Sequence, residues 1–182
     1  MTNEPRTPTK ADLLQALRSS GKKVVDRVGA LPPESLEQGR YESGWNGRQI
    51  LAHVASIEWT YAKLFDVARE TPAAAPATVP AQVRRTEPGE TPGTPTRIAQ
   101  GGIDSYNERQ VAKRAEASVA GLLEEFQKNR AATIAAVEAA DEALLARPIR
   151  SAGGITGPLA GVLNAVAVQH VLAHTNDIAG AG

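Results

Sequence analysis

The sequence of 182 residues contains no cysteine, only three histidines and few aromatic residues, which make up 4% of the chain. Without cysteine the chain can form neither a disulfide framework nor a thiolate metal site, and any catalytic thiol must come from another molecule. The scarcity of aromatic residues, together with abundant alanine, favours a helical core of small side chains over a β-sheet.

A surplus of charge and long apolar runs are also absent. Lysine plus arginine and aspartate plus glutamate each number 20, so the charge balance predicts no nucleic-acid or membrane-surface partner. No apolar run approaches the roughly 20 residues that span a bilayer. The polar, proline-containing start MTNEPRTPTKAD does not resemble a secretory signal peptide. We therefore expect a cytoplasmic protein whose residues 1–182 form one domain.

Four segments have apolar residues at helical spacing, which predicts an all-α fold, a four-helix bundle. The predicted helices cover roughly Lys10–Gly29, Gly47–Glu70, Gly102–Ala140 and Pro158–Ile178. The third is long enough to bend, and residues 1–9 are expected to form a flexible tail. Thr9 with Asp12, and Asn46 with Gln49, have the spacing of N-terminal helix caps.

Proline separates the second predicted helix from the third. Six of the twelve prolines lie between residues 71 and 96, among threonine, alanine and glycine. This segment is too long for a tight turn between neighbouring antiparallel helices. It therefore predicts either a crossover between the two ends of a helical bundle or a flap over a pocket. A second loop is expected at 147–157, before the last helix.

All three histidines fall on the predicted apolar stripes of helices. His53 lies on the stripe of the second helix, and His170 and His174 continue that of the fourth. Two imidazoles at positions i and i+4 have Cβ atoms about 6 Å apart on one helix face, so both can reach one metal ion. A third imidazole from a facing helix would complete a three-histidine site with coordination positions left open. The alternative is three separate core histidines, each with its own hydrogen bonds.

Other catalytic motifs are missing from the chain. The stretch HVLAH has Val171 where zinc peptidases of the HExxH type place their glutamate. The sequence has no glycine-rich phosphate loop and no ordered serine–histidine–aspartate signature. A shared metal site is therefore the chemistry that these residues favour.

Three stretches together resemble the DinB-like superfamily of four-helix bundles: WNGRQILAHVASIEW at 45–59, GGIDSYNERQVAKR at 101–114 and QHVLAHTNDI at 169–178. The similarity extends from about Ala11 to Ile178, and it favours the branch that contains the N-terminal domain of mycothiol-dependent maleylpyruvate isomerase. The resemblance implies an up-down-down-up bundle with a long crossover between helices two and three. It also implies a divalent metal, zinc or nickel, held by His53, His170 and His174.

Characterised members of this superfamily use a low-molecular-weight bacterial thiol, mycothiol or bacillithiol, to transfer or isomerise substrates. The resemblance therefore implies a small thiol and an electrophilic substrate as partners, and a homodimer as the assembly. We expect the metal to hold the thiol as a thiolate, which then attacks the electrophile. A metal-dependent hydrolase and a non-catalytic metal-binding or sensing dimer are the alternatives.

Several polar residues are candidates for supporting roles. Asn107 is the candidate catalytic residue, since its amide could bind the substrate; otherwise it bonds to backbone near a helix start. Asp177 and Glu58 are expected either to orient imidazoles or to lie on solvated faces. Trp45 is expected to pack at the end of the bundle. Three arginines are candidates for steering an anionic substrate or are surface residues: Arg48, Arg109 and Arg114.

Overall fold

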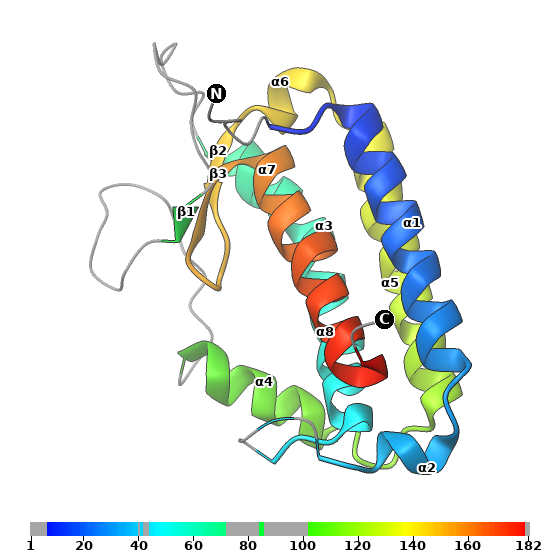
Figure 1. The fold of residues 1–182 in the computed structure, drawn as a ribbon. Helices are drawn as coiled ribbons and strands as arrows, with labels where there is room; N and C mark the ends of the chain where they lie inside the picture. Colours follow the sequence, from blue (N-terminus) through cyan, green and yellow to red (C-terminus); the bar gives the residue numbers. More distant parts are fainter. Residues whose placement is uncertain (1–6, 40, 42–43, 72–83, 86–101, 181–182) are drawn as a thin grey trace, which may run out of the picture.

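The computed structural model describes residues 7–39, 41, 44–71, 84–85 and 102–180, and Figure 1 shows their arrangement. Four long rods lie side by side as a helical bundle, as the sequence predicts. The rods are α1 (Lys10–Gly29), α3 (Gly47–Glu70), α5 (Val119–Ala139) and a C-terminal rod that joins α7 (Leu159–Leu163), the π-helix η1 (Asn164–Gln169) and α8 (His170–Ala179). The shorter helices are α2 (Pro33–Leu36), α4 (Gly102–Ala112) and α6 (Glu142–Leu145).

Helices α1 and α3 begin where the sequence predicts, because side chains cap their first turns. The Thr9 hydroxyl accepts from the Asp12 N–H at 3.2 Å, and the Asp12 carboxylate accepts from the Thr9 N–H at 3.1 Å. Asn46 and Gln49 form the same reciprocal pair, with distances of 2.8 and 2.9 Å. Such caps satisfy N–H groups that have no partner within the helix.

The predicted third helix is divided into two helices. α4 ends at Ala112, a turn follows, and Ser118 starts α5 by accepting a hydrogen bond from the Gly121 N–H at 3.1 Å. α4 lies outside the four rods and packs against the first turns of α3 (Figure 1). The sequence allows for a bend in this region, but the serine cap produces a complete break.

Three short strands, which the sequence did not predict, form an antiparallel sheet in the order β1–β3–β2. β2 (Pro148–Arg150) and β3 (Ile155–Pro158) form a hairpin within the predicted 147–157 loop, and β1 (Arg84–Arg85) pairs with the other edge of β3. Gly154 allows the hairpin to turn, since its φ of 80° lies in the left-handed region that favours glycine. The expectation of a loop over 147–157 was therefore wrong for the residues of β2 and β3, and the turn between the strands covers only 151–154.

Two predicted segments lie mostly outside the described residues. Only residues 7–9 of the predicted tail are described, and only Thr71 and β1 of the proline-rich connection. The predictions of a flexible tail and of a crossover or flap are therefore not tested by the structure. Among the helices that are described, none is long and apolar enough to cross a membrane.

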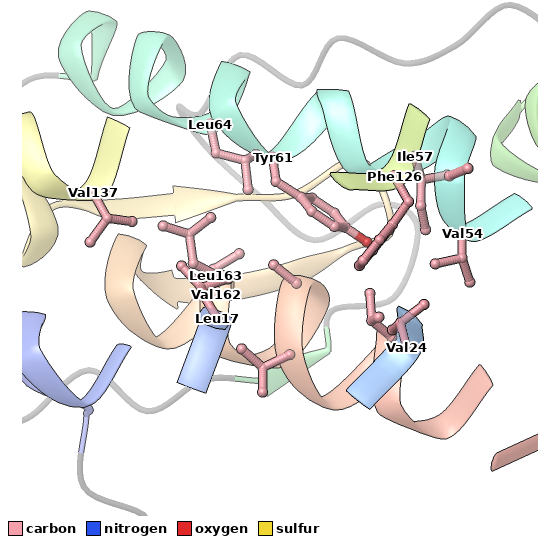
Figure 2. Packing of buried hydrophobic residues seen from close by; sticks show 14 of the residues in the cluster. Leu17, Val24, Val54, Ile57, Tyr61, Leu64, Phe126, Val137, Val162 and Leu163 are labelled. Carbon is pink, nitrogen blue, oxygen red and sulfur yellow. The ribbon is translucent and has the colours of Figure 1, made fainter. Parts of the chain in front are cut away.

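The core between the rods consists of buried aliphatic and aromatic side chains, and Figure 2 shows how they interdigitate. All four rods contribute to it: Leu17 and Val24 from α1, Val54, Ile57, Tyr61 and Leu64 from α3, Phe126 and Val137 from α5, and Val162 and Leu163 from α7. Burial of such side chains is the main force that holds the rods together. The packed rods give the polar groups described below a rigid support.

Candidate metal centre

The three histidines of the chain come together between α3 and α8. His53, His170 and His174 each place a ring nitrogen within 4.8 Å of the nitrogens of the other two. The ring centroids are 4.4 Å apart for His170 and His174, 5.1 Å for His53 and His174, and 5.8 Å for His53 and His170. The fold therefore brings the three predicted ligands close to one another, although His53 is far from the other two in the sequence.

The three imidazoles differ in their exposure to solvent. His53 is 5% exposed, His174 is half-buried and His170 is exposed. The expectation that every histidine lies on a buried stripe was therefore wrong for His170. The cluster extends from the core to the surface of the bundle, with His170 at its outer end.

The π-helix η1 explains why His170 is exposed. Helical spacing places Leu159, Leu163, Val166, His170 and His174 on one face only if the rod has 3.6 residues per turn throughout. A π turn contains i→i+5 hydrogen bonds and so accommodates an extra residue. Side chains beyond it are rotated by about 100° relative to an uninterrupted α-helix. The buried residues of α8 are accordingly Val171, Thr175 and Ile178.

His174 is held in place by two further side chains. Its Nδ1 lies 2.5 Å from the Tyr41 hydroxyl oxygen and 3.2 Å from Oδ2 of Asp177. The Tyr41 hydroxyl donates to the same carboxylate oxygen at 2.5 Å. Because Nδ1 is engaged in these contacts, Nε2 is the nitrogen of His174 that is available to a ligand. Asp177 thus contacts an imidazole, as one of the two expectations for it required, whereas sequence reasoning missed Tyr41.

Burial favours the neutral form of these imidazoles. Burial first, and then repulsion by His174 and His170, lower the pKa of His53 from 6.5 to about 3. Burial also lowers the pKa of His174, although the carboxylate of Asp177 opposes the shift. Burial, followed by Asp177, raises the pKa of the Tyr41 hydroxyl, which therefore stays protonated. Neutral imidazole is the form that offers a lone pair to a metal.

The donor set fits a divalent metal ion. Nδ1 of His53 is buried and has no hydrogen-bond partner among the described residues, which is costly for a polar atom unless a ligand satisfies the ring. Three neutral imidazole nitrogens suit zinc, nickel and other first-row divalent ions. The three nitrogens lie within 4.8 Å of one another, a spacing that one ion can bridge.

A cavity of about 170 Å³ lies between the first turns of α3 and the end of α4, and the residues that line it include none of the three imidazoles. Trp45 lines this cavity, and its ring also packs against that of His53, with centroids 5.5 Å apart. The expected position of Trp45 at the bundle end was thus incomplete, because the indole also contacts a candidate ligand. Asn107 of α4 is half-buried, and its Oδ1 has no hydrogen-bond partner among the described residues.

The three candidate arginines have different surroundings. Arg48 and Arg114 line the cavity, whereas Arg109 is exposed. Arg48 donates to Glu37 at 2.8 Å, and Arg114 makes two bonds to Glu125 at 2.5 and 2.9 Å. The positive charge that these two residues bring to the cavity is therefore partly neutralised.

Glu58 occupies neither of its expected positions. Its side chain is fully buried, but it makes a bidentate ion pair with Arg130 of α5 rather than a contact with an imidazole. Sequence reasoning missed this pair because the two residues lie on different helices. A signal was present in the sequence, since Glu58 is the only acidic residue, and no lysine or arginine occurs, between Ile50 and Ala62.

Comparisons with known proteins agree with this fold. A family model described as the DinB superfamily matches residues 16–178. The crystal structure of mycothiol-dependent maleylpyruvate isomerase is similar with a TM-score of 0.67 and 15% identity, over 96% of this chain and 62% of that protein. A second similar structure is that of YfiT from Bacillus subtilis, described as a probable metal-dependent hydrolase with an unusual four-helix bundle topology. Its TM-score is 0.64 and its identity 17%, over 96% of this chain and 89% of that protein. No curated protein matches the chain by sequence.

Proposed function

We propose, from the premise that this chain belongs to the DinB superfamily, that it is a divalent-metal-dependent enzyme acting with a low-molecular-weight thiol. The reaction is a transfer of the thiol to an electrophilic substrate or a thiol-assisted isomerisation. The proposed ligands of zinc or nickel are His53, His170 and His174, and the proposed thiol is mycothiol or bacillithiol. The similar fold of a mycothiol-dependent isomerase supports this choice of chemistry.

One observation carries the proposal: three imidazole nitrogens from two helices lie within 4.8 Å of one another, at a position where His170 is exposed. Three protein ligands leave room for a further ligand, as in catalytic rather than structural metal sites. When bound, a divalent metal supplies the charge that keeps a thiol in its reactive thiolate form. The absence of cysteine from the chain fits a thiol that arrives from solution.

The residues around the imidazoles have separate proposed roles. Asp177 and Tyr41 orient His174 through its Nδ1. The cavity beside Trp45 is the proposed substrate site, in which Arg48 would attract an anionic group. Asn107 is the proposed catalytic residue because its Oδ1 is buried and has no hydrogen-bond partner among the described residues, although Asn107 is not among the residues that line this cavity.

The test combines metal analysis with thiol-dependent turnover. Protein purified without added metal is analysed for its metal content, loaded with zinc or nickel, and mixed with mycothiol or bacillithiol and a chlorodinitrobenzene. We expect turnover that requires both metal and thiol and that disappears in His170→Ala. Gln169→Ala is the matched control, because Gln169 is exposed beside His170 and outside the imidazole cluster. Full turnover in His170→Ala would overturn the proposed site.

A metal-dependent hydrolase is the second candidate, and the similar fold of YfiT favours it. In this case water replaces the thiol as nucleophile, and the same imidazoles hold the metal. Cleavage of model esters or amides that needs metal but no thiol would support the hydrolase. Tight metal binding without either activity would support the third candidate, a non-catalytic metal-binding or sensing protein.

The proposal includes an assembly and a location. We propose one domain over residues 1–182, a homodimer, and action in the cytoplasm, where small thiols are kept reduced. Sedimentation velocity of the metal-loaded protein tests the dimer, and cell fractionation tests the location. A monomer at micromolar concentration would contradict the proposed assembly without affecting the metal site.

A further inference from the structure

A second cluster of polar side chains lies in the interior of the bundle, and its hydrogen bonds do not include the imidazoles. Arg130 is 4% exposed, and it makes two hydrogen bonds to the fully buried carboxylate of Glu58, at 2.6 and 2.9 Å. Its Nη1 donates to the Leu17 carbonyl at 3.0 Å and to the Ser20 hydroxyl at 2.9 Å. Its Nη2 also donates to the Ala167 carbonyl at 2.7 Å. All five N–H groups of the guanidinium therefore have partners.

The bond to Ala167 is important because this residue lies inside the π-helix η1. A π turn departs from the regular i→i+4 pattern; it is rare in proteins and is frequently found at functional sites. Ala167 is fully buried, so solvent cannot supply a hydrogen bond to its carbonyl. Arg130 supplies an N–H donor to this carbonyl, and it thereby stabilises the widened turn.

The same guanidinium connects the two helices that carry the imidazoles. On α3, its partner Glu58 lies five residues after His53; on the C-terminal rod, its partner Ala167 lies three residues before His170. The bidentate pair with Glu58 has a fixed planar geometry, so it fixes the orientation of the guanidinium relative to α3 as well as stabilising the pair. The distance between α3 and η1 is thus set at one point, which is close in sequence to His53 on α3 and to His170 on the C-terminal rod.

We propose that Arg130, with Glu58, is a positioning residue of the metal centre. By donating to the Ala167 carbonyl while it is paired with Glu58 of α3, Arg130 maintains the π turn, and the π turn sets the rotation of α8 at which His170 and His174 lie beside His53. The role in metal binding rests on the proposed function of the three imidazoles. The role in maintaining the π turn does not, so it can be tested on the metal-free protein.

A purely stabilising role is the competing explanation. It is weakly supported, because a buried ion pair can often be replaced by well-packed apolar side chains of similar volume without loss of stability. The apolar double variant Glu58→Leu/Arg130→Met therefore separates the two roles. It fills the interior, leaves no buried charge unpaired, and removes the donor to Ala167.

The first experiment compares the wild type with this double variant. We expect the variant to fold with a similar urea midpoint, and its metal-free crystal structure to have regular α-helical bonds over 164–169. We expect its zinc affinity to fall by about 10- to 100-fold, as for other residues that orient metal ligands, and its Co²⁺ absorption spectrum to change. Ser20→Ala is the control, because Ser20 binds the same guanidinium from α1, which carries no imidazole. Its zinc affinity and Co²⁺ spectrum should match the wild type.

Two results would overturn the proposal. One is a folded double variant that retains the π turn; the other is a variant that loses the turn but keeps the zinc affinity and Co²⁺ spectrum of the wild type. If the double variant does not fold, Arg130→Lys serves instead, since lysine keeps the charge but lacks the planar fork. Wild-type zinc affinity in folded Arg130→Lys would equally overturn it. A wild type that binds no metal would refute the proposed function, while the π turn of the variant would still decide the structural role.

Discussion

Polar side chains meet at two places in this bundle, and the two places differ in how fully their hydrogen-bonding capacity is used. In the interior centre, Arg130 and Glu58 are buried and every N–H of the guanidinium has a partner. In the imidazole centre, Nδ1 of His53 has no hydrogen-bond partner among the described residues, and His170 is exposed. A saturated centre has no capacity left for a ligand and can act on the imidazoles only through the structure that it holds, whereas an unsaturated centre has capacity for a ligand.

This difference gives each centre its own measurable property. Substitutions that remove only one charge of the interior centre should mainly lower the free energy of unfolding, because they leave the other charge buried without its partner. Substitutions in the imidazole centre should mainly change the affinity for metal. A reversal of this pattern in any of the following experiments would break the distinction.

The largest effect is expected from removing one charge of the interior pair. Arg130→Ala leaves the carboxylate of Glu58 buried without its partner, so the free energy of unfolding should fall by about 3–5 kcal/mol. Urea denaturation of the metal-free protein, followed by circular dichroism, measures this. Arg18→Ala is the control, because the exposed Arg18–Glu138 pair should contribute less than about 1 kcal/mol. Equal losses in the two variants would contradict the prediction.

Removal of an imidazole should greatly weaken metal binding but hardly change the free energy of unfolding. His174→Ala eliminates one of three proposed ligands, so the zinc dissociation constant should rise by at least about 100-fold, more than for loss of an orienting residue. The free energy of unfolding of the metal-free protein should change by less than about 1 kcal/mol, as for other partly exposed positions. Competition with a chromophoric chelator measures the first quantity and urea denaturation the second. A large loss of stability with unchanged affinity would show that His174 is a structural residue.

Acid should destabilise the metal-free protein through His53. Its pKa is about 3 in the folded protein and 6.5 ordinarily, so between these values the unfolded chain binds a proton that the folded chain excludes. The stabilising contribution is therefore complete above about pH 6.5 and is lost as the pH falls towards 3. Between about pH 7 and pH 5 the free energy of unfolding should decrease by about 1–2 kcal/mol. His53→Gln should remove most of this dependence; an unchanged slope would place the acid sensitivity elsewhere.

The smallest effect is expected from Tyr41→Phe. The variant loses the hydroxyl that contacts His174 and Asp177, but Asp177 still lies 3.2 Å from Nδ1 of His174. Zinc affinity should therefore fall by about tenfold or less, at the lower end of the range for orienting residues. Isothermal titration calorimetry measures the change. A loss comparable to that in His174→Ala would indicate that Tyr41 is itself a ligand.

The parts of the fold that the sequence predicts are those determined by local interactions. The caps at Thr9 and Asn46 and the apolar spacing of the long helices involve residues within a few positions of each other. The β2–β3 hairpin was missed because its short strands contain two prolines and one glycine and have no clear alternation. The break before Ser118 was missed because apolar spacing continues on both sides of it.

The candidate site shows the same division. The spacing of His170 and His174 and the apolar surroundings of His53 predicted the cluster, and the structure brings its members together. Tyr41 could not be predicted, because it reaches His174 from a distant segment between α2 and α3. The π turn could not be predicted either, since it depends on packing and hydrogen bonds between rods rather than on a local pattern.

The placement of the imidazoles on α3 and on the last described helix also has a consequence for biosynthesis. His53 leaves the ribosome well before His170, so a nascent chain cannot assemble the cluster until the C-terminal rod has been synthesised. A cation that binds the assembled cluster stabilises only chains whose C-terminal rod has docked. Occupancy of the centre would thus distinguish chains whose C-terminal rod has docked on α3 from chains in which it has not.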